Sequence, residues 1–123
     1  GLHPDWGGTY FLPRLIGMAK AAEMIFTGDM IDATEALRLG LVSGVYSPEE
    51  LLPAAYELAG KIAAGPPIAI RLAKRALYNG ENTDLRGGLE FETFAQNICF
   101  ETEDAREGIR AFVEKRPPQF KGR

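Results

Sequence analysis

Cysteine is almost absent from this sequence of 123 residues, with Cys99 as the single example. One cysteine excludes a disulfide within the chain and agrees with a reducing compartment, so we expect a cytoplasmic protein. Because Cys99 lies in an apolar stretch without a basic neighbour, we interpret it as an inert core thiol. Histidine is equally scarce. His3 has no cluster of cysteines or carboxylates near it in the sequence, so we expect no metal site.

The sequence also lacks long apolar runs and a surplus of positive charge. No stretch approaches the ~20 apolar residues that a helix needs to cross a bilayer. The 14 lysine and arginine residues are outnumbered by 17 aspartate and glutamate residues, and a net charge of −3 does not predict a nucleic-acid-binding face. We therefore expect neither nucleic acid nor a membrane as a partner. An apolar content of 46% and a charged content of 25% are ordinary for a globular domain.

Glycine, proline, an acid and aromatic residues gather only in residues 1–16. Pro4 favours an extended residue before it, and Gly7 and Gly8 let the backbone lie close to a ligand or a neighbouring segment. Asp5 then lies where a helix begins. Its carboxylate is either the cap of that helix or a catalytic acid beside free backbone N–H groups, and the residues alone leave both interpretations open.

Glycine and proline divide the rest of the chain into amphipathic helices, so the fold is predicted to be mainly α. Ser47, Pro48 and Glu50 form the clearest start signal, a capping box with proline in the first helical position. Asp32 and Thr102 are predicted to cap two further helices. The predicted helices cover residues 6–16 or 8–16, 18–26, 33–39, 48–64, 68–78, 84–101 and 103–116.

Apolar residues predict which faces these helices bury. Residues 84–101 carry a wide apolar stripe rich in aromatic side chains, which packs either on other helices of the chain or partly on a partner subunit. In the last helix, the residues predicted to face inward are Ala105, Ile109, Phe112 and Val113. Residues 41–46 have β-branched and aromatic side chains and are the best candidate for one short strand.

A series of motifs runs through nearly the whole chain: Gly1-Leu2-x-Pro4-x-x-Gly7-Gly8-Thr9, Leu12-Pro13-Arg14-Leu15-Ile16-Gly17, Ala21-x-Glu23-Met24, Thr27-Gly28-Asp29, Ile31-Asp32-Ala33-x-Glu35-Ala36, Leu39-Gly40-Leu41-Val42, Thr102-Glu103-Asp104-Ala105-Arg106-Glu107-Gly108-Ile109 and Ala111-Phe112-Val113-Glu114-Lys115-Arg116. In order and spacing, the motifs resemble the enoyl-CoA hydratase/isomerase (crotonase) family. The resemblance implies the C-terminal helical part of a crotonase-like α/β fold with a ββα spiral. Residues 1–17 would be the active-site loop and first short helix of the core domain. Residues 18–123 would be a helical region for oligomerisation and coenzyme A binding.

Family members are about twice as long as this chain. Their first half carries two oxyanion-hole N–H groups and, in hydratases, two glutamates, so the resemblance places these groups before Gly1. At the position of Asp5, hydratases usually have glycine, whereas several relatives that isomerise double bonds or displace halide have an aspartate that works on the acyl chain. The resemblance therefore makes Asp5 the candidate catalytic residue. The same resemblance gives five candidates for binding the substrate and coenzyme A: Gly1, Pro4, Trp6, Phe112 and Lys115.

Two basic features, Lys115 and a stripe of basic residues at helical spacing, allow two interpretations each. Lys115 either meets a phosphate of coenzyme A or only interacts favourably with the helix dipole. A basic stripe at helical spacing either contacts the same phosphates or is a solvated face. The stripe consists of Arg71, Lys74, Arg75 and Tyr78.

The predicted function is the C-terminal part of an enoyl-CoA hydratase/isomerase, with double-bond isomerisation preferred over hydration and phenylacetyl-CoA breakdown as one setting. Coenzyme A is then part of the substrate, and no separate cofactor is expected. By resemblance the whole enzyme is a homo-oligomer, a trimer or a hexamer, and the isolated chain is expected to be inactive. The alternatives are a non-catalytic helical module for assembly and coenzyme A binding, and an unrelated helical interaction domain.

Overall fold

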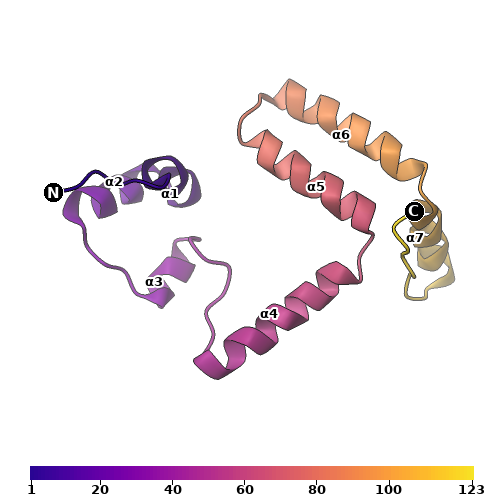
Figure 1. Ribbon diagram of the computed structural model, residues 1–123, viewed down its shortest axis with the longest axis horizontal. Helices are drawn as coiled ribbons and strands as arrows, with labels where there is room; N and C mark the ends of the chain where they lie inside the picture. Colours follow the sequence, from indigo (N-terminus) through magenta and orange to yellow (C-terminus); the bar gives the residue numbers. More distant parts are fainter. The chain divides into compact units, whose positions relative to one another are not determined.

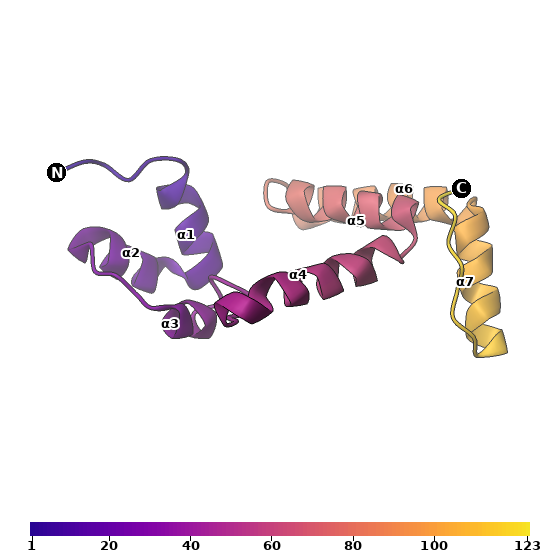
Figure 2. The same cartoon turned by 60° about the horizontal axis from the view of Figure 1, so that its bottom comes forward.

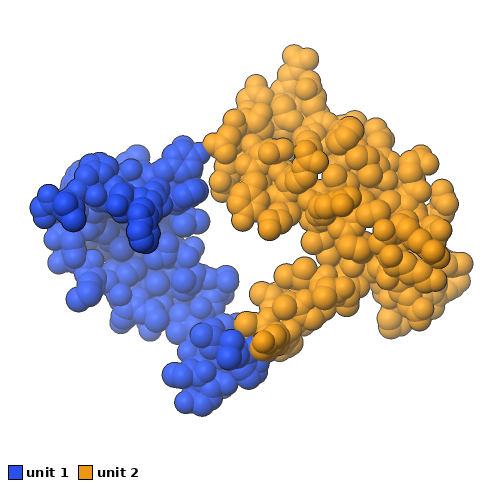
Figure 3. Space-filling model, in the orientation of Figure 1, with its two compact units in different colours: residues 1–54 blue, residues 55–123 orange.

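The computed structural model describes all residues from 1 to 123 and contains seven α-helices and no strand. The chain divides into two compact units, Gly1–Ala54 and Ala55–Arg123, which are coloured separately in Figure 3. The mainly α fold expected from the sequence is confirmed.

The first unit contains α1 (Gly8–Ile16), α2 (Met18–Thr27), α3 (Ala33–Arg38) and the start of α4 (Pro48–Ala63) (Figure 1). Helices α1 and α2 pack against each other across the single residue Gly17. Because Gly17 has a φ of 84°, it lets the chain turn sharply between the two helices.

The second unit contains the rest of α4, α5 (Pro67–Gly80), α6 (Leu85–Phe100) and α7 (Glu103–Glu114). Helices α5 and α6 form an antiparallel hairpin (Figure 1), and α6 packs on α7. After α7 the chain reverses, and residues 115–123 run back along this helix (Figure 2). This last segment is called the C-terminal tail below.

Local side-chain caps start several helices, as the sequence predicts. Asp32 accepts a hydrogen bond from the Glu35 N–H at 2.7 Å, and Thr102 accepts one from the Ala105 N–H at 3.0 Å. The capping box before α4 is reciprocal, because Ser47 Oγ accepts from the Glu50 N–H and Glu50 Oε2 accepts from the Ser47 N–H.

Residues 41–46 form bends and irregular structure instead of a strand. A strand needs a neighbour to satisfy its N–H and C=O groups, and no other segment of the chain pairs with these residues. The β-branched and aromatic side chains of this segment are therefore not sufficient to make a strand here.

The buried core is small. The buried apolar residues are Ala21, Ala36, Leu72 and Ala111. The inward orientation predicted for the last helix is wrong for three of its four residues, since Ile109, Phe112 and Val113 are 62%, 86% and 74% exposed. The buried face of α7 instead contains Asp104 and Ala111, and the C-terminal tail lies over the neighbouring Gly108 with its Phe120 ring.

The apolar stripe of α6 is also largely uncovered. Leu85, Leu89 and Phe94 are exposed, although Phe91 packs near Phe94 with ring centroids 6.2 Å apart. Phe91 and Ala95 are partly buried, so the prediction that the stripe packs on other helices of the chain holds only in part.

Two adjacent glycines, Gly7 and Gly8, lie at the start of α1, and only one of them has a conformation that requires glycine. Gly7 has a φ of 82°, and a Cβ added to it would lie 2.6 Å from the ring of Phe11. A Cβ added to Gly8 would meet only Pro4, at 3.7 Å. Gly7 is therefore required by both its backbone and its packing, whereas Gly8 is not.

We expect Gly7→Ala to lower the free energy of unfolding by about 1–2 kcal/mol, because an alanine is strained in the left-handed region. Gly8→Ala is the matched control and should change it by less than about 1 kcal/mol, with a stabilising sign. Both variants are compared by urea denaturation of the gene product that carries this chain. Equal effects at the two positions would contradict this account of the turn.

Candidate active site and coenzyme A site

Asp5 lies in a tight turn that leads into α1. Its carbonyl oxygen accepts a hydrogen bond from the Gly8 N–H at 2.9 Å, and the two central residues, Trp6 and Gly7, have φ angles of 52° and 82°. Two positive φ angles are the mark of a type I′ turn, which normally takes asparagine and glycine. Trp6 is a bulky residue in a conformation that costs roughly 1–2 kcal/mol. Strain of this kind is concentrated at functional sites.

The Asp5 carboxylate is exposed and makes no hydrogen bond within the chain. The cap position of α1 belongs to Gly7, and no side chain caps this helix. The interpretation of Asp5 as a simple helix cap is therefore wrong in this structure.

The other candidates near Asp5 lie on the same exposed segment. Gly1, Pro4 and Trp6 are all exposed, and Trp6 presents 95% of its surface. The turn brings Pro4 next to Gly8 and places Trp6 directly beside Asp5. An exposed, rigid aromatic side chain next to an unpaired carboxylate suits contact with an apolar acyl chain.

Phe112 and Lys115 lie at the C-terminal end of α7, in the second unit. They are three residues apart and both are exposed, Phe112 by 86%. Lys115 has a φ of 54° and a ψ of 40°, a left-handed conformation that ends the helix. An exposed aromatic residue and an exposed cation thus lie within one turn of each other at the end of α7.

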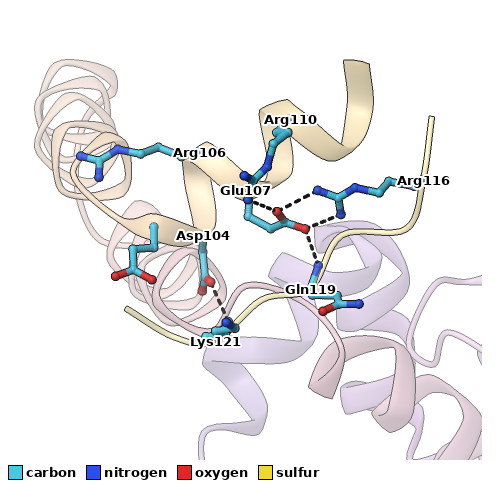
Figure 4. A pocket seen from close by; sticks show the side chains of 8 residues that line it. Asp104, Arg106, Glu107, Arg110, Arg116, Gln119 and Lys121 are labelled. Carbon is cyan, nitrogen blue, oxygen red and sulfur yellow. Dashed lines mark hydrogen bonds and ion pairs between the residues drawn. The ribbon is translucent and has the colours of Figure 1, made fainter. Parts of the chain in front are cut away.

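A charged hollow of about 610 Å³ opens between α7 and the C-terminal tail (Figure 4). Its lining residues are all polar: Glu103, Asp104, Arg106, Glu107, Arg110, Arg116, Gln119 and Lys121. Sequence analysis did not identify this cluster. The chain reversal after α7 creates it, and no short motif signals that reversal.

Glu107 is the centre of this cluster. Its carboxylate accepts hydrogen bonds from Arg116 at 2.6 and 3.0 Å, from Arg110 at 2.8 Å and from the Gln119 N–H at 3.0 Å. The Arg116 guanidinium is the main reason that the pKa of Glu107 lies far below its ordinary range, with Arg110 and the Gln119 N–H adding to the effect. In return, Glu107 raises the pKa of Arg116 above its already high value.

The basic stripe of α5 is exposed, and part of it packs on aromatic rings. The guanidinium of Arg75 lies 5.6 Å from the ring centre of Phe91, and the ammonium of Lys74 lies 5.9 Å from that of Tyr78. Arg75 therefore has a structural partner within its own unit. Cys99 is half-buried near this hairpin rather than fully enclosed.

No group of three histidine, cysteine, aspartate or glutamate side chains is arranged to hold a metal ion. None of the helices has the length and apolar character needed to span a bilayer.

The first unit thus has an exposed carboxylate, Asp5, and the second unit has an exposed aromatic residue and an exposed cation at the end of α7. A comparison with known families gives this arrangement its context, because the sequence profile of the enoyl-CoA hydratase/isomerase family matches residues 1–123. The chain belongs to this family.

Individual relatives agree with this assignment. The chain is 44% identical over 120 residues to the crotonyl-CoA hydratase of Syntrophomonas wolfei, covering 98% of this chain and 46% of the relative. It is 45% identical over 124 residues to the short-chain-enoyl-CoA hydratase of Clostridium acetobutylicum, covering 100% of this chain and 48% of the relative. The crystal structure of an enoyl-CoA hydratase from Bacillus anthracis superimposes with a TM-score of 0.94 and 47% identity, over 100% of this chain and 48% of that one. The chain thus spans about half the length of the relatives it matches.

The Glu107 network predicts a specific response to acid. Because the pKa of Glu107 is depressed in the folded state, the unfolded chain binds a proton that the folded chain does not once the pH falls below about 4.3. Stability contributed by the ionised carboxylate is therefore present at neutral pH and decreases as the pH falls below that value.

We expect Glu107→Gln to destabilise the gene product that carries this chain at pH 6, and the gap between wild type and variant to shrink steadily towards pH 3. Urea denaturation at each pH measures the gap. Glu57→Gln is the matched control, since Glu57 pairs only with Lys61 on an exposed helix face. A gap for Glu107→Gln that stays constant from pH 6 to pH 3 would show that the ionised carboxylate is not responsible.

Proposed function

We propose that this chain is part of an enzyme that acts on the acyl group of an enoyl-CoA thioester. Membership of the enoyl-CoA hydratase/isomerase family over residues 1–123 is the observation that carries the proposal. Coenzyme A enters as part of the substrate, so the reaction needs no separate cofactor. We also propose that the enzyme is cytoplasmic, which agrees with its single cysteine.

We further propose double-bond isomerisation as the reaction, with Asp5 as the acid/base. In a 3-enoyl-CoA, the Asp5 carboxylate would take a proton from the α carbon and return it to the γ carbon, while the double bond moves from β–γ to α–β. The free, exposed carboxylate supports this role because a general base needs an available lone pair. The enolate that forms on the thioester would be stabilised by the family's oxyanion-hole N–H groups.

Hydration is the alternative reaction. Both curated relatives described above are named as hydratases, which favours addition of water to a 2-enoyl-CoA. Asp5 would then have no part in the proton transfer. The two reactions use different substrates, so kinetics can separate them.

The two groups of candidate residues correspond to the two ends of the substrate. Gly1, Pro4 and Trp6 would line the acyl end beside Asp5, where all of these residues are exposed. Phe112 and Lys115 would hold the nucleotide end, with the aromatic ring against the base and the ammonium near the phosphates. This pairing supports coenzyme A because one helix end offers both kinds of contact.

A non-catalytic role in assembly is a second candidate function. Its support is the amount of uncovered apolar surface on the helices, for example Phe26 at 84% and Leu77 at 74% exposed. Faces of this kind are normally covered by another chain or segment. We propose a homo-oligomer, a trimer or a hexamer, as the state in which part of this surface is covered.

Asp5→Asn in the gene product that carries this chain is expected to reduce kcat for isomerisation of a 3-enoyl-CoA about 10²–10⁴-fold, the usual contribution of a positioned acid/base. Asp29→Asn is the matched control, since Asp29 is another exposed aspartate and lies outside the proposed site. Hydration of a 2-enoyl-CoA is assayed in parallel. If neither activity changes, Asp5 does no chemistry and the assembly role gains support.

The 123 residues on their own are expected to show no turnover of any enoyl-CoA. Each oxyanion donor contributes about 10²–10³ in rate, and by resemblance these donors lie in the part of the family fold that the chain does not span. Purified chain is assayed with 2-enoyl and 3-enoyl substrates after circular dichroism has confirmed its helices. Turnover above that of a no-protein blank would overturn this expectation.

A further inference from the structure

The C-terminal tail is fixed to α7 at several points, of which the first is a buried carboxylate. Asp104 is only 3% exposed, and its side chain accepts a hydrogen bond from the backbone N–H of Lys121 at 2.6 Å (Figure 4). It also accepts one from the backbone N–H of Gly122 at 2.8 Å. Its own N–H donates to the carbonyl of Arg123 at 3.2 Å. A buried charge is tolerated only when donors satisfy it, so these bonds hold the end of the tail firmly.

The second point is the ion pair between Glu107 and Arg116, nine residues apart. Two nitrogens of the guanidinium reach the two carboxylate oxygens, at 2.6 and 3.0 Å. The Glu107 side chain is only 12% exposed, and the same carboxylate also accepts from the Gln119 N–H at 3.0 Å. Arg116 is therefore fixed immediately after the last turn of α7.

Lys115 lies directly between the end of α7 and this anchored arginine. Its left-handed backbone, with a φ of 54°, is unfavourable for a residue that has a side chain and persists where the surroundings impose it. The Arg116 N–H donates to the Ala111 carbonyl at 3.0 Å, which continues the reversal. The bonds on both sides of Lys115 thus determine where its side chain leaves the backbone.

The Lys115 side chain itself makes no hydrogen bond or ion pair within the chain, whereas its neighbour Arg116 is paired with two carboxylates. One turn earlier, Phe112 is 86% exposed. An ammonium without a partner in the chain and an exposed ring at the same helix end match the chemistry of a purine nucleotide with its phosphates.

We propose that Glu107, acting through Arg116, is a positioning residue that directs Lys115 towards the phosphates of the coenzyme A nucleotide. This inference rests on the proposed role of Lys115 in binding coenzyme A. Asp104 serves the same purpose from the other end, by keeping the tail against α7.

The test is a double-mutant cycle of Glu107→Gln and Lys115→Ala in the gene product that carries this chain. KM and kcat are measured with an enoyl-CoA and with the matching enoyl-pantetheine, which lacks the nucleotide. Lys115→Ala and Glu107→Gln should each raise KM for the enoyl-CoA about tenfold. The double variant should be no worse than Lys115→Ala alone, and kcat and the kinetics with the enoyl-pantetheine should stay unchanged.

Glu35→Gln is the matched control, because Glu35 also binds an arginine, Arg38, through two hydrogen bonds of 2.6 Å, and lies in the first unit. It should leave KM unchanged. If Glu107→Gln does not fold, Arg116→Lys replaces it, since lysine keeps the charge but cannot bind both carboxylate oxygens at once. The same pattern of KM values is then expected.

The outcomes separate the two levels of the proposal. If Lys115→Ala leaves KM for the enoyl-CoA unchanged, the coenzyme A role of Lys115 is wrong, and the inference about Glu107 is overturned with it. If Lys115→Ala raises KM but Glu107→Gln does not, only the positioning role is overturned. If Glu107→Gln also impairs the enoyl-pantetheine, or adds to Lys115→Ala, Glu107 has a general structural role and the inference is again overturned.

Discussion

The small amount of apolar surface that this chain buries is the constraint on which the rest of the structure depends. Burial of apolar surface is normally the main stabilising contribution to a fold, yet few apolar side chains are buried within this chain. Local interactions therefore define its helices: side-chain caps at their starts, glycines between them and ion pairs along their faces. The proposed homo-oligomer would cover part of these apolar faces.

Sequence patterns were sufficient where the interaction is local. The caps at Asp32, Ser47 and Thr102 need only groups within three residues, so their spacing predicts them. The breaks at Gly17 and Gly28 follow from backbone conformations that glycine adopts easily.

Sequence patterns failed where the interaction depends on the path of the chain. Periodicity correctly gave α7 an apolar face, but it could not show that the tail would cover the opposite, Asp104-containing face and leave Phe112 and Val113 exposed. The Glu107–Arg116 pair spans nine residues and forms only because the chain reverses. The strained turn at Trp6 was also hidden, since tryptophan does not normally signal a left-handed backbone.

The candidate residues correspond to the two chemically different ends of the proposed substrate. An acyl-CoA has a reactive end, where a carboxylate moves a proton, and a nucleotide end, where an aromatic ring and a cation give affinity. Asp5 and the pair of Phe112 and Lys115 offer these two kinds of contact in separate units of the chain. A residue with a positive φ angle occurs in both places. Trp6 is next to Asp5 in the sequence, and Lys115 itself has a positive φ at the end of α7.

A crystal structure of the gene product with a bound, unreactive acyl-CoA analogue tests this account most directly. The account predicts the Asp5 carboxylate within about 3–3.5 Å of the α or γ carbon of the acyl chain, the distance at which proton transfer is productive. It also predicts Phe112 and Lys115 against the nucleotide. A bound analogue whose acyl carbons lie far from Asp5, or whose nucleotide contacts neither Phe112 nor Lys115, would contradict it.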